Sequence, residues 1–290
     1  MKKDAEGFFY PSVLKIDDCV SCGTCTKKCP VKGDSQHFVV QNINAWGGYF
    51  KDKNYLRKSA SGGIATALSE IIIQQNGIVY GASYTNDLRG VMYEKIENEQ
   101  FLYKLKGSKY TQARKKGIYA SVLHDLEQRR KVLFIGLPCD VYALKLFVKK
   151  DYDNLITCDL ICHGPTSENV LNDYLQFVLE GRGITPVSIN TRYKLRASKP
   201  PCIRVMFSDG TDDCRELYKS EYGMAFQVMK RPYCNHCAFK GNHRASDVTI
   251  GDYHAVQYHS LVYNELGVSS AITHTKKRPS YIKKSASLTF

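Results

Sequence analysis

A chain of 290 residues can bury about three quarters of its surface around one large core, and its 43% hydrophobic and 24% charged residues exclude disordered and collagen-like classes. No apolar stretch approaches the roughly eighteen residues of a membrane span, and the start Met1–Glu6 lacks an apolar signal core, so we expect no membrane span and a cytoplasmic location. The net charge of +13 favours an anionic partner. Because no aromatic-basic groove pattern is visible, we expect an acidic coenzyme or electron carrier and no nucleic acid.

The predicted elements alternate between strands and helices along most of the chain. In chain order they are a strand pair at Phe8–Tyr10 and Val13–Lys15, a helix from Ile64 that Gly77 caps, strands at Ile78–Tyr80 and Val91–Tyr93, a helix at Ile118–Arg129, a strand at Val132–Ile135, a helix at Val141–Val148, a strand at Leu155–Ile161, a helix over residues 168–180, and a strand at Ile203–Phe207 before an Asp209-Gly210 turn. Residues 30–58 carry no clear period. The alternation predicts an α/β (α+β) fold with a mixed sheet and a later part richer in strands.

The first of two cysteine sets is a compact run near the N-terminus. Eleven cysteines, an odd number, argue against a closed disulfide framework and favour ligands, nucleophiles or core residues. The run consists of Cys19, Cys22, Cys25 and Cys29, followed by Pro30. This is the bacterial ferredoxin spacing, and it favours a [4Fe-4S] cluster over a zinc knuckle.

The second set is discontinuous. Cys234 and Cys237 supply two ligands from one loop, while Cys139 and Cys162 each follow a predicted strand, where α/β sheets place chemistry. Four thiolates can hold structural zinc as well as iron, and both alternatives stay open. A nucleophile and base at Cys162 and His163 is a further alternative, although neighbouring residues seldom face one another.

The remaining cysteines have structural interpretations. Cys158 lies inside an apolar strand and is expected to fill the core. Cys202 and Cys214 flank the predicted hairpin. Counting from its turn places Cys202 opposite Leu217, so we expect both to be structural and not directly paired.

Two glycine loops are candidates for binding a dinucleotide. The first opens the predicted helix at Ile64, where free N–H groups favour phosphate; its candidate residues are Ser59, Ser61, Gly62 and Gly63. The second combines a cation, a hydroxyl and an aromatic ring in Gly107, Ser108, Lys109 and Tyr110. Either loop could instead be an ordinary helix cap or turn.

Taken together and in this order, the strings Ser59–Gly63, Gly107–Tyr110, Gly136–Cys139, Asp159–Gly164, Arg231–Cys237 and Ser246–Asp252 are more specific than any one alone. The chain resembles the coenzyme F-420 hydrogenase/dehydrogenase β-subunit family over residues 7–274, with a ferredoxin-type segment in front. The resemblance implies FAD at the two glycine loops and an iron–sulfur cluster at Cys139, Cys162, Cys234 and Cys237. Gly251–Tyr253 are expected to line the same cavity.

The resemblance also implies a function. We expect an iron–sulfur flavoprotein oxidoreductase that passes electrons between a reduced carrier, a deazaflavin or ferredoxin, and FAD through one or two 4Fe-4S clusters, with a possible partner oxidoreductase subunit. A non-catalytic electron-relay or structural metal-binding module is the alternative. No catalytic residue is identified.

The expected domains are a ferredoxin-type segment (1–35), a linker (36–58), an N-terminal part of the family region (59–165), a C-terminal part with the Cys-x2-Cys ligands (166–275) and a basic tail (276–290). Only six residues precede Gly7, where relatives have a first cysteine run, and relatives continue beyond Phe290. We therefore expect a truncated ferredoxin-like segment, and two explanations stay open: the chain is a fragment of a longer protein, or its start codon is misassigned.

Overall fold

The computed structural model describes residues 1–13, 16–31, 44–196, 200–241, 244–254, 260–275 and 288–289. Most of the predicted basic tail, residues 32–43 around the start of the predicted linker, and Leu14 and Lys15 of the predicted strand pair lie outside these ranges.

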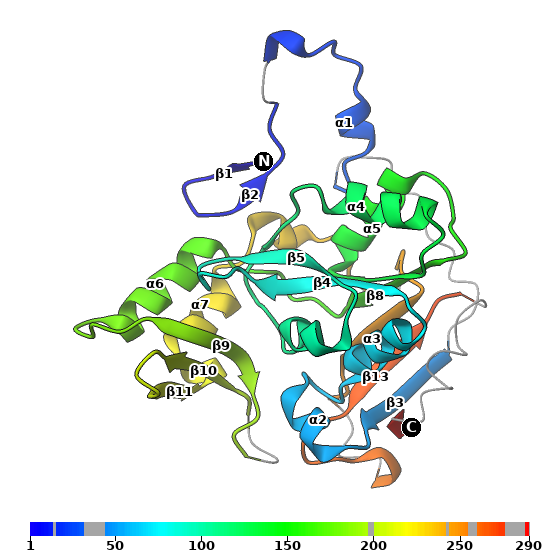
Figure 1. Cartoon of the computed structure of the whole chain (residues 1–290). Coiled ribbons are helices and arrows are strands. Elements are labelled where there is room, and N and C mark those ends of the chain that lie inside the picture. The colour runs from blue at the N-terminus through cyan, green and yellow to red at the C-terminus, as the bar shows by residue number, and fades with distance from the viewer. Residues whose placement is uncertain are drawn as a thin grey trace.

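A nine-stranded mixed sheet forms the centre of the molecule (Figure 1). Its strands, in spatial order, are β14 (Leu288–Thr289), β3 (Asn44–Phe50), β13 (Ser269–Thr273), β12 (Val248–Asp252), β8 (Leu155–Leu160), β7 (Val132–Gly136), β4 (Ile78–Tyr84), β5 (Val91–Ile96) and β6 (Ala113–Arg114). The central strands β12, β8, β7 and β4 run parallel, whereas β13 and β5 pair antiparallel at their flanks. The predicted mixed α/β fold is confirmed.

Helices cover both faces of this sheet because successive residues of its strands point to opposite sides. Val79, Leu133 and Ile156 pack with α3 (Ile64–Gln74) in one core. Their neighbours in sequence, including Ile78, Tyr80, Val132, Phe134 and Leu155, pack in a second core with α4 (Ile118–Glu127) and α5 (Pro138–Val148). Cys158 is completely buried in the first core, as predicted.

A smaller, separate sheet of β9 (Pro186–Tyr193), β10 (Cys202–Phe207) and β11 (Asp212–Glu216) carries its own core. Helices α6 (Glu168–Leu179) and α7 (Glu221–Val228) pack on it (Figure 1). The register differs from our expectation by one residue. Cys202 lies opposite Glu216 and not Leu217, because Phe207 N–H bonds to Thr211 O and lengthens the connection around Gly210.

The segments on either side of the first cysteine set contain elements that we did not expect. Phe9–Tyr10 (β2) pairs with Lys2–Lys3 (β1), and the expected partner strand Val13–Lys15 lies largely outside the described residues. Residues 30–58 lack a clear pattern, yet they include β3 and α2 (Lys53–Lys58). Gly47 and Gly48 interrupt the alternation of β3, and α2 is too short to show a helical period.

Candidate functional site

The structure brings the four cysteines of the second set toward one edge of the central sheet. Cys139 is the second residue of α5, immediately after β7, and Cys162 follows the adjacent parallel strand β8. Cys234 lies in the short helix η4 (Pro232–His236), and Cys237 comes directly after it. Four thiols from three separate parts of the chain therefore share the carboxyl edge of β7 and β8.

Close packing between the loops shows how near these cysteines lie. A Cβ atom on Gly164 would come within 2.9 Å of Cys234 Cβ and 3.2 Å of Cys234 Sγ, and Gly164 has a φ of +120°. The N–H of Gly164 also donates to Cys162 Sγ at 3.3 Å. Only glycine fits between the two cysteines, since its lack of a side chain lets the backbone of one loop touch the thiol of the other.

The thiols also interact electrostatically. Burial, together with the charges of Cys234, Asp140 and Cys237, raises the pKa of Cys162 to about 12 despite the hydrogen bond from Gly164. Burial likewise raises the pKa of Cys139; Asp140 adds to this effect and Lys115 opposes it. The thiols of Cys139 and Cys162 are thus neutral until a metal ion displaces their protons.

As a donor set, four converging cysteines match the thiolate preference of iron–sulfur clusters and of zinc. In the part of the chain that the structure describes, no three or more His, Cys, Asp or Glu side chains stand close enough together to hold a metal ion. The four cysteines come from distant segments of the chain. Because their thiols do not yet form such a group, their side chains would need to turn toward a metal group in order to ligate it.

The first cysteine set surrounds a short helix. Cys19, Cys22 and Cys25 are exposed and Cys29 is half-buried. Gly23 directly precedes α1 (Thr24–Lys27) and has a φ of +69°, a left-handed conformation that favours glycine. Cys22 Sγ lies 3.3 Å from Thr24 Oγ1, and hydrogen bonds from the hydroxyl and the backbone N–H of Thr24 to the thiolate lower the pKa of Cys22.

In the first glycine loop, the side chains are engaged within the protein. The Ser59 hydroxyl donates to Tyr55 O and contacts Thr66 Oγ1, while Ser61 Oγ donates to Val268 O. Gly62 packs so tightly that a Cβ atom would lie 2.2 Å from Gly48 O. The groups that remain for binding a phosphate are the backbone N–H groups at the N-terminal end of α3, which begins after Gly63.

In the second loop, the side chain of Lys109 holds the loop together. Its Nζ donates to the carbonyl oxygens of Lys104, Lys106 and Gly107 at 2.7, 2.9 and 3.4 Å. Burial lowers its pKa to about 7. Ser108 accepts a hydrogen bond from Thr191, and the Tyr110 ring packs on Phe226 with 4.2 Å between centroids.

A cationic cluster links the two loops. Arg192, near the end of β9, donates to both carboxylate oxygens of Asp252 at 2.9 and 3.1 Å and reaches Tyr110 Oη at 3.4 Å. Lys194 Nζ donates to Ser61 O at 2.6 Å, and burial lowers its pKa to about 7. Burial opposes the charge of Asp252, but Arg192 brings its pKa below the usual value.

We did not identify Arg192 and Lys194 as candidate site residues from the sequence. Arg192 belongs to β9 and Lys194 follows the end of that strand, about eighty residues beyond Tyr110, and only the topology brings them there. The one available signal was the cationic pair with a single intervening residue, Arg192-Tyr193-Lys194, at the end of a β-rich segment. Asp252 lies in the Gly251–Tyr253 string that we expected to line the same cavity.

A family model that describes the C-terminal part of the coenzyme F420 hydrogenase/dehydrogenase beta subunit matches residues 129–287, more than half of the chain. The chain belongs to this family. The expected resemblance is confirmed, and the matched region contains the second cysteine set together with Arg192, Lys194 and Asp252. The family is named for redox enzymes, and an oxidoreductase role follows at that level.

A solved structure supports the fold of this F420 hydrogenase/dehydrogenase β-subunit family member. The F420-reducing [NiFe] hydrogenase complex from Methanosarcina barkeri, in a xenon-derivatised form, aligns with a TM-score of 0.58 and 16% sequence identity. The alignment covers 87% of this chain and 81% of that one. No curated protein matches.

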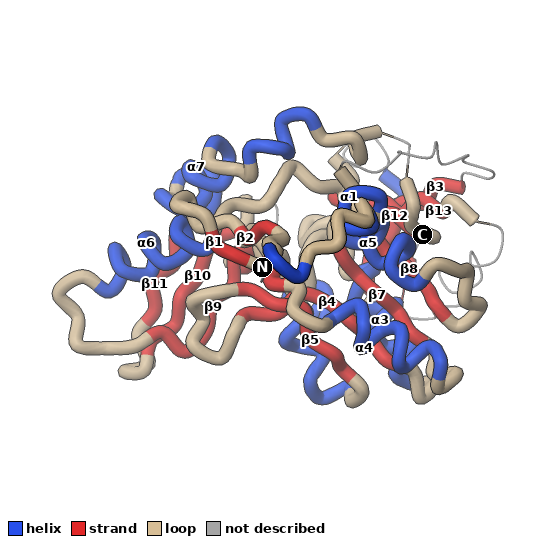
Figure 2. The backbone as a smooth tube through the Cα atoms, turned by 90° about the horizontal axis from the view of Figure 1, so that it is seen from above, coloured by secondary structure: helices blue, strands red, loops and turns tan. Residues whose placement is uncertain are grey.

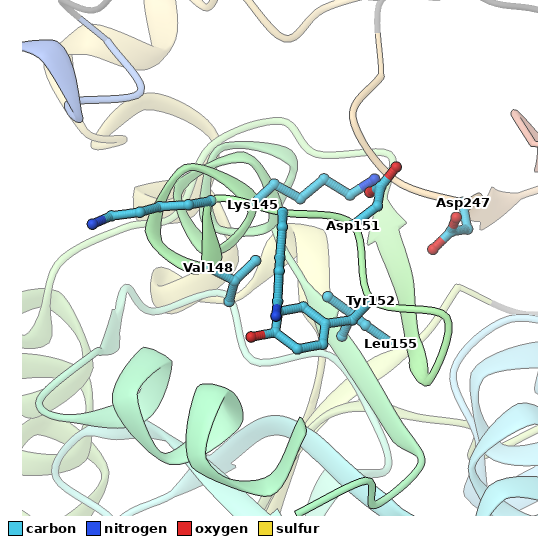
Figure 3. Close-up of a pocket in the computed structure, with 8 residues that line it drawn as sticks. Lys145, Val148, Asp151, Tyr152, Leu155 and Asp247 are labelled. Atoms are coloured by element: carbon cyan, nitrogen blue, oxygen red, sulfur yellow. The ribbon is translucent and has the colours of Figure 1, made fainter. Parts of the chain in front are cut away.

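The first cysteine set and both glycine loops precede the part of this family member that the family model matches. A cavity of about 260 Å³ lies at the other end of α5 from Cys139, lined by Lys145, Val148, Asp151, Tyr152, Leu155 and Asp247 among others (Figure 3). It adjoins the starts of β8 and β12 and therefore lies on the opposite edge of the sheet from the cysteines. Among the described residues, no helix is both long and apolar enough to cross a bilayer.

Proposed function

We propose that this chain is an iron–sulfur flavoprotein oxidoreductase subunit that passes electrons between a reduced carrier, a deazaflavin or ferredoxin, and FAD. The observation that carries the proposal is the gathering of Cys139, Cys162, Cys234 and Cys237 from three segments at one sheet edge. A role in the core alone would not require four cysteines from three separate segments to meet beyond the ends of β7 and β8.

For the metal group, these four cysteines are the proposed ligands, and the run of Cys19, Cys22, Cys25 and Cys29 would hold a second cluster. The buried Asp140 accepts from Tyr93 Oη at 2.8 Å and lies 3.2 Å from Lys115 Nζ. These contacts fix the first turn of α5 and so orient Cys139.

For the flavin, the structure suggests a division of roles. Because the Ser59, Ser61 and Lys109 side chains already have partners, we propose that these loops contribute backbone N–H groups and shape. Arg192 and Lys194 lie between the loops and also have partners, in Asp252 and in the carbonyl oxygen of Ser61. Unlike the serines they carry cationic groups, so we propose Arg192 as the main positive charge for the diphosphate and Lys194, whose pKa burial lowers to about 7, as a hydrogen-bond donor. When bound, a flavin exchanges hydride with a deazaflavin and single electrons with a cluster.

The engaged side chains of both glycine loops also favour the second candidate, an electron-relay or structural metal-binding module without flavin. The two candidates differ in one observable, the presence of bound flavin. Without flavin, the protein has no hydride chemistry.

The test is anaerobic purification followed by assays of iron, sulfide and released flavin. Two clusters and one flavin correspond to about eight irons and one flavin per chain, and Cys162→Ala is expected to retain about four irons. Cys158→Ala is the matched control, because Cys158 lies within β8 and is completely buried in the core. Zinc without flavin would contradict the oxidoreductase, and iron without flavin would favour the relay module.

A further inference from the structure

The N-terminal hairpin is attached to the core through one buried amide. The N–H of Phe9 donates to Gln112 Oε1 at 2.7 Å, and the carbonyl of Phe9 accepts from Gln112 Nε2 at 3.1 Å. Gln112 is 2% exposed and the neighbouring Phe8 is 3% exposed. A single side chain thus satisfies both backbone groups of Phe9, as a neighbouring strand would.

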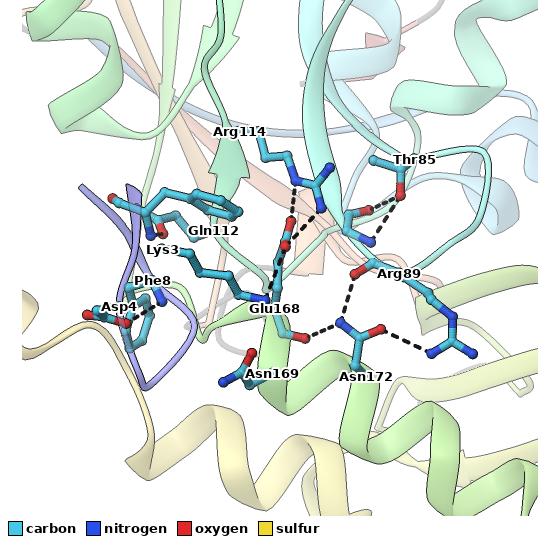
Figure 4. Close-up of polar contacts among 12 residues, drawn as sticks. Lys3, Asp4, Phe8, Thr85, Arg89, Gln112, Arg114, Glu168, Asn169 and Asn172 are labelled. Carbon is cyan, nitrogen blue, oxygen red and sulfur yellow. Dashed lines mark hydrogen bonds and ion pairs between the residues drawn. The ribbon is translucent and has the colours of Figure 1, made fainter. Parts of the chain in front are cut away.

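A buried carboxylate provides a second attachment (Figure 4). Glu168, at the start of α6, accepts two bonds from Arg114 at 2.6 and 2.9 Å, and Lys3 Nζ lies 3.7 Å from its Oε2 atom. Next to it, Asn169 Nδ2 donates to Ala5 O at 3.1 Å. Polar side chains at β6, just before it, and at the start of α6 therefore hold the hairpin in place.

Gly7 is the residue that lets the hairpin fit against these side chains. Its φ is +92°, and a Cβ atom there would lie 2.6 Å from Asn169 Cγ and 2.9 Å from Asn169 N. The backbone of Asn169 cannot move without displacing the start of α6. A side chain at position 7 is therefore incompatible with the docked hairpin for reasons of both backbone strain and space.

The end of the hairpin touches the loop of the second cysteine set. The Arg231 guanidinium lies 4.7 Å from the ring centroid of Tyr10, and Arg231 N–H donates to Pro165 O near Cys162. Farther along, the helix α1 of the first set lies above α5 in Figure 1, and the two overlap in the view from above in Figure 2.

We infer that residues 2–10 form a tether that holds the run Cys19–Cys29 beside the second cysteine set, with Gln112, Glu168 and Asn169 as its positioning residues. The functional meaning of this placement rests on the proposed function. There, the tether would fix the separation between the groups that the two cysteine sets would hold, and these groups would supply one-electron transfer. The placement itself concerns only this chain.

The experiment uses the metal-free, reduced full-length protein and a short bifunctional thiol reagent. Peptide mapping is expected to find cross-links between Cys29 and Cys234 or Cys237. In Gly7→Ala, where the hairpin cannot dock, the yield is expected to fall at least tenfold. Hydrogen exchange of the Phe9 amide is expected to quicken in the same variant, because its bond to Gln112 is lost.

Gly181→Ala is the matched control. Gly181 has a φ of +70° with no atom within 4 Å of its Cβ position, so the substitution brings similar backbone strain without a clash near the hairpin. It is expected to cross-link as the parent does. Absence of cross-links in the parent protein, or equal yields in Gly7→Ala, would overturn the inference. Neither result depends on iron or flavin content, which tests the proposed function separately.

Discussion

At the scale of single residues, glycines and buried charges decide how the loops meet. The N–H of Gly62 donates a hydrogen bond to Ser269 Oγ at 2.8 Å. There is no room for a side chain at this position, since a Cβ atom would also come within 2.4 Å of Ser269 N. From the sequence alone, we expected this glycine to let a phosphate group approach the start of the helix. The structure shows a packing role that a single sequence cannot reveal, because β13 lies two hundred residues away.

We expect Gly62→Ala to lower the free energy of unfolding by about 3 kcal/mol, because the new methyl group meets backbone atoms on both sides. Urea unfolding followed by circular dichroism measures this. Gly183→Ala, with open space around its Cβ position, is the control and is expected to change stability little. Equal effects in both variants would show that Gly62 is not closely packed.

Lys194 is expected to make the free energy of unfolding depend on pH. Its folded-state pKa of about 7 lies below the ordinary value of about 10.4 because burial disfavours the charged amine. Between these values the unfolded chain binds the extra proton, so stability contributed at this site rises with pH across that window and is lowest below it. The difference in unfolding free energy between the parent and Lys194→Met should therefore shift in favour of the parent from about pH 7 to about pH 10.

Urea unfolding of the two proteins at several pH values within that window measures this difference. Lys53→Met, at an exposed position in the first turn of α2, is the comparison and is expected to show no such trend. A pH-independent difference for Lys194→Met would mean that this amine stays charged in the folded protein.

At the scale of elements, strand ends were the most informative feature of the sequence. Cys139 and Cys162 could be placed because each follows an apolar strand, and the structure has both at the carboxyl edge of neighbouring strands. Helix α3 could be placed from its spacing of apolar residues. The cations of β9 could not, since the pairing of a small sheet with distant loops leaves no local pattern.

Arg192, near the end of β9, therefore provides a direct test of the proposed flavin site. We expect Arg192→Gln to weaken flavin binding about tenfold or more, because it removes a buried, pre-oriented cation. Arg204→Gln is the matched control, since Arg204 pairs with Asp212 on the neighbouring strand at 2.7 Å but is more exposed. Released flavin per chain, and its titration back into the stripped protein, report the effect.

Loss of Arg192 also leaves Asp252 without its partner. The double variant Arg192→Gln/Asp252→Asn removes both charges and is expected to recover stability without recovering flavin. Recovery of flavin in the double variant would mean that Arg192 acts only by neutralising Asp252.

At the scale of the whole molecule, the net charge of +13 predicts how a carrier approaches. The positive charge should attract an acidic ferredoxin, and dissolved salt screens this attraction. The rate at which the ferredoxin delivers electrons is therefore expected to fall about tenfold between low and high ionic strength. Stopped-flow reduction of the anaerobic protein measures this rate. A small uncharged reductant serves as the comparison, and equal salt sensitivity for both would argue against electrostatic guidance.

The pairing of β3 with β13 has a consequence for how the chain is made. Residues 44–50 meet residues 269–273, so β3 waits for its partner on a ribosome that adds about 5–20 residues per second. That delay is on the order of ten to forty seconds. For most of it, the thiols of Cys19–Cys29 have left the exit tunnel while Cys234 and Cys237 are still untranslated. Any machinery that delivers iron during this interval would therefore meet the first set complete and at most Cys139 and Cys162 of the second, which could be loaded only later.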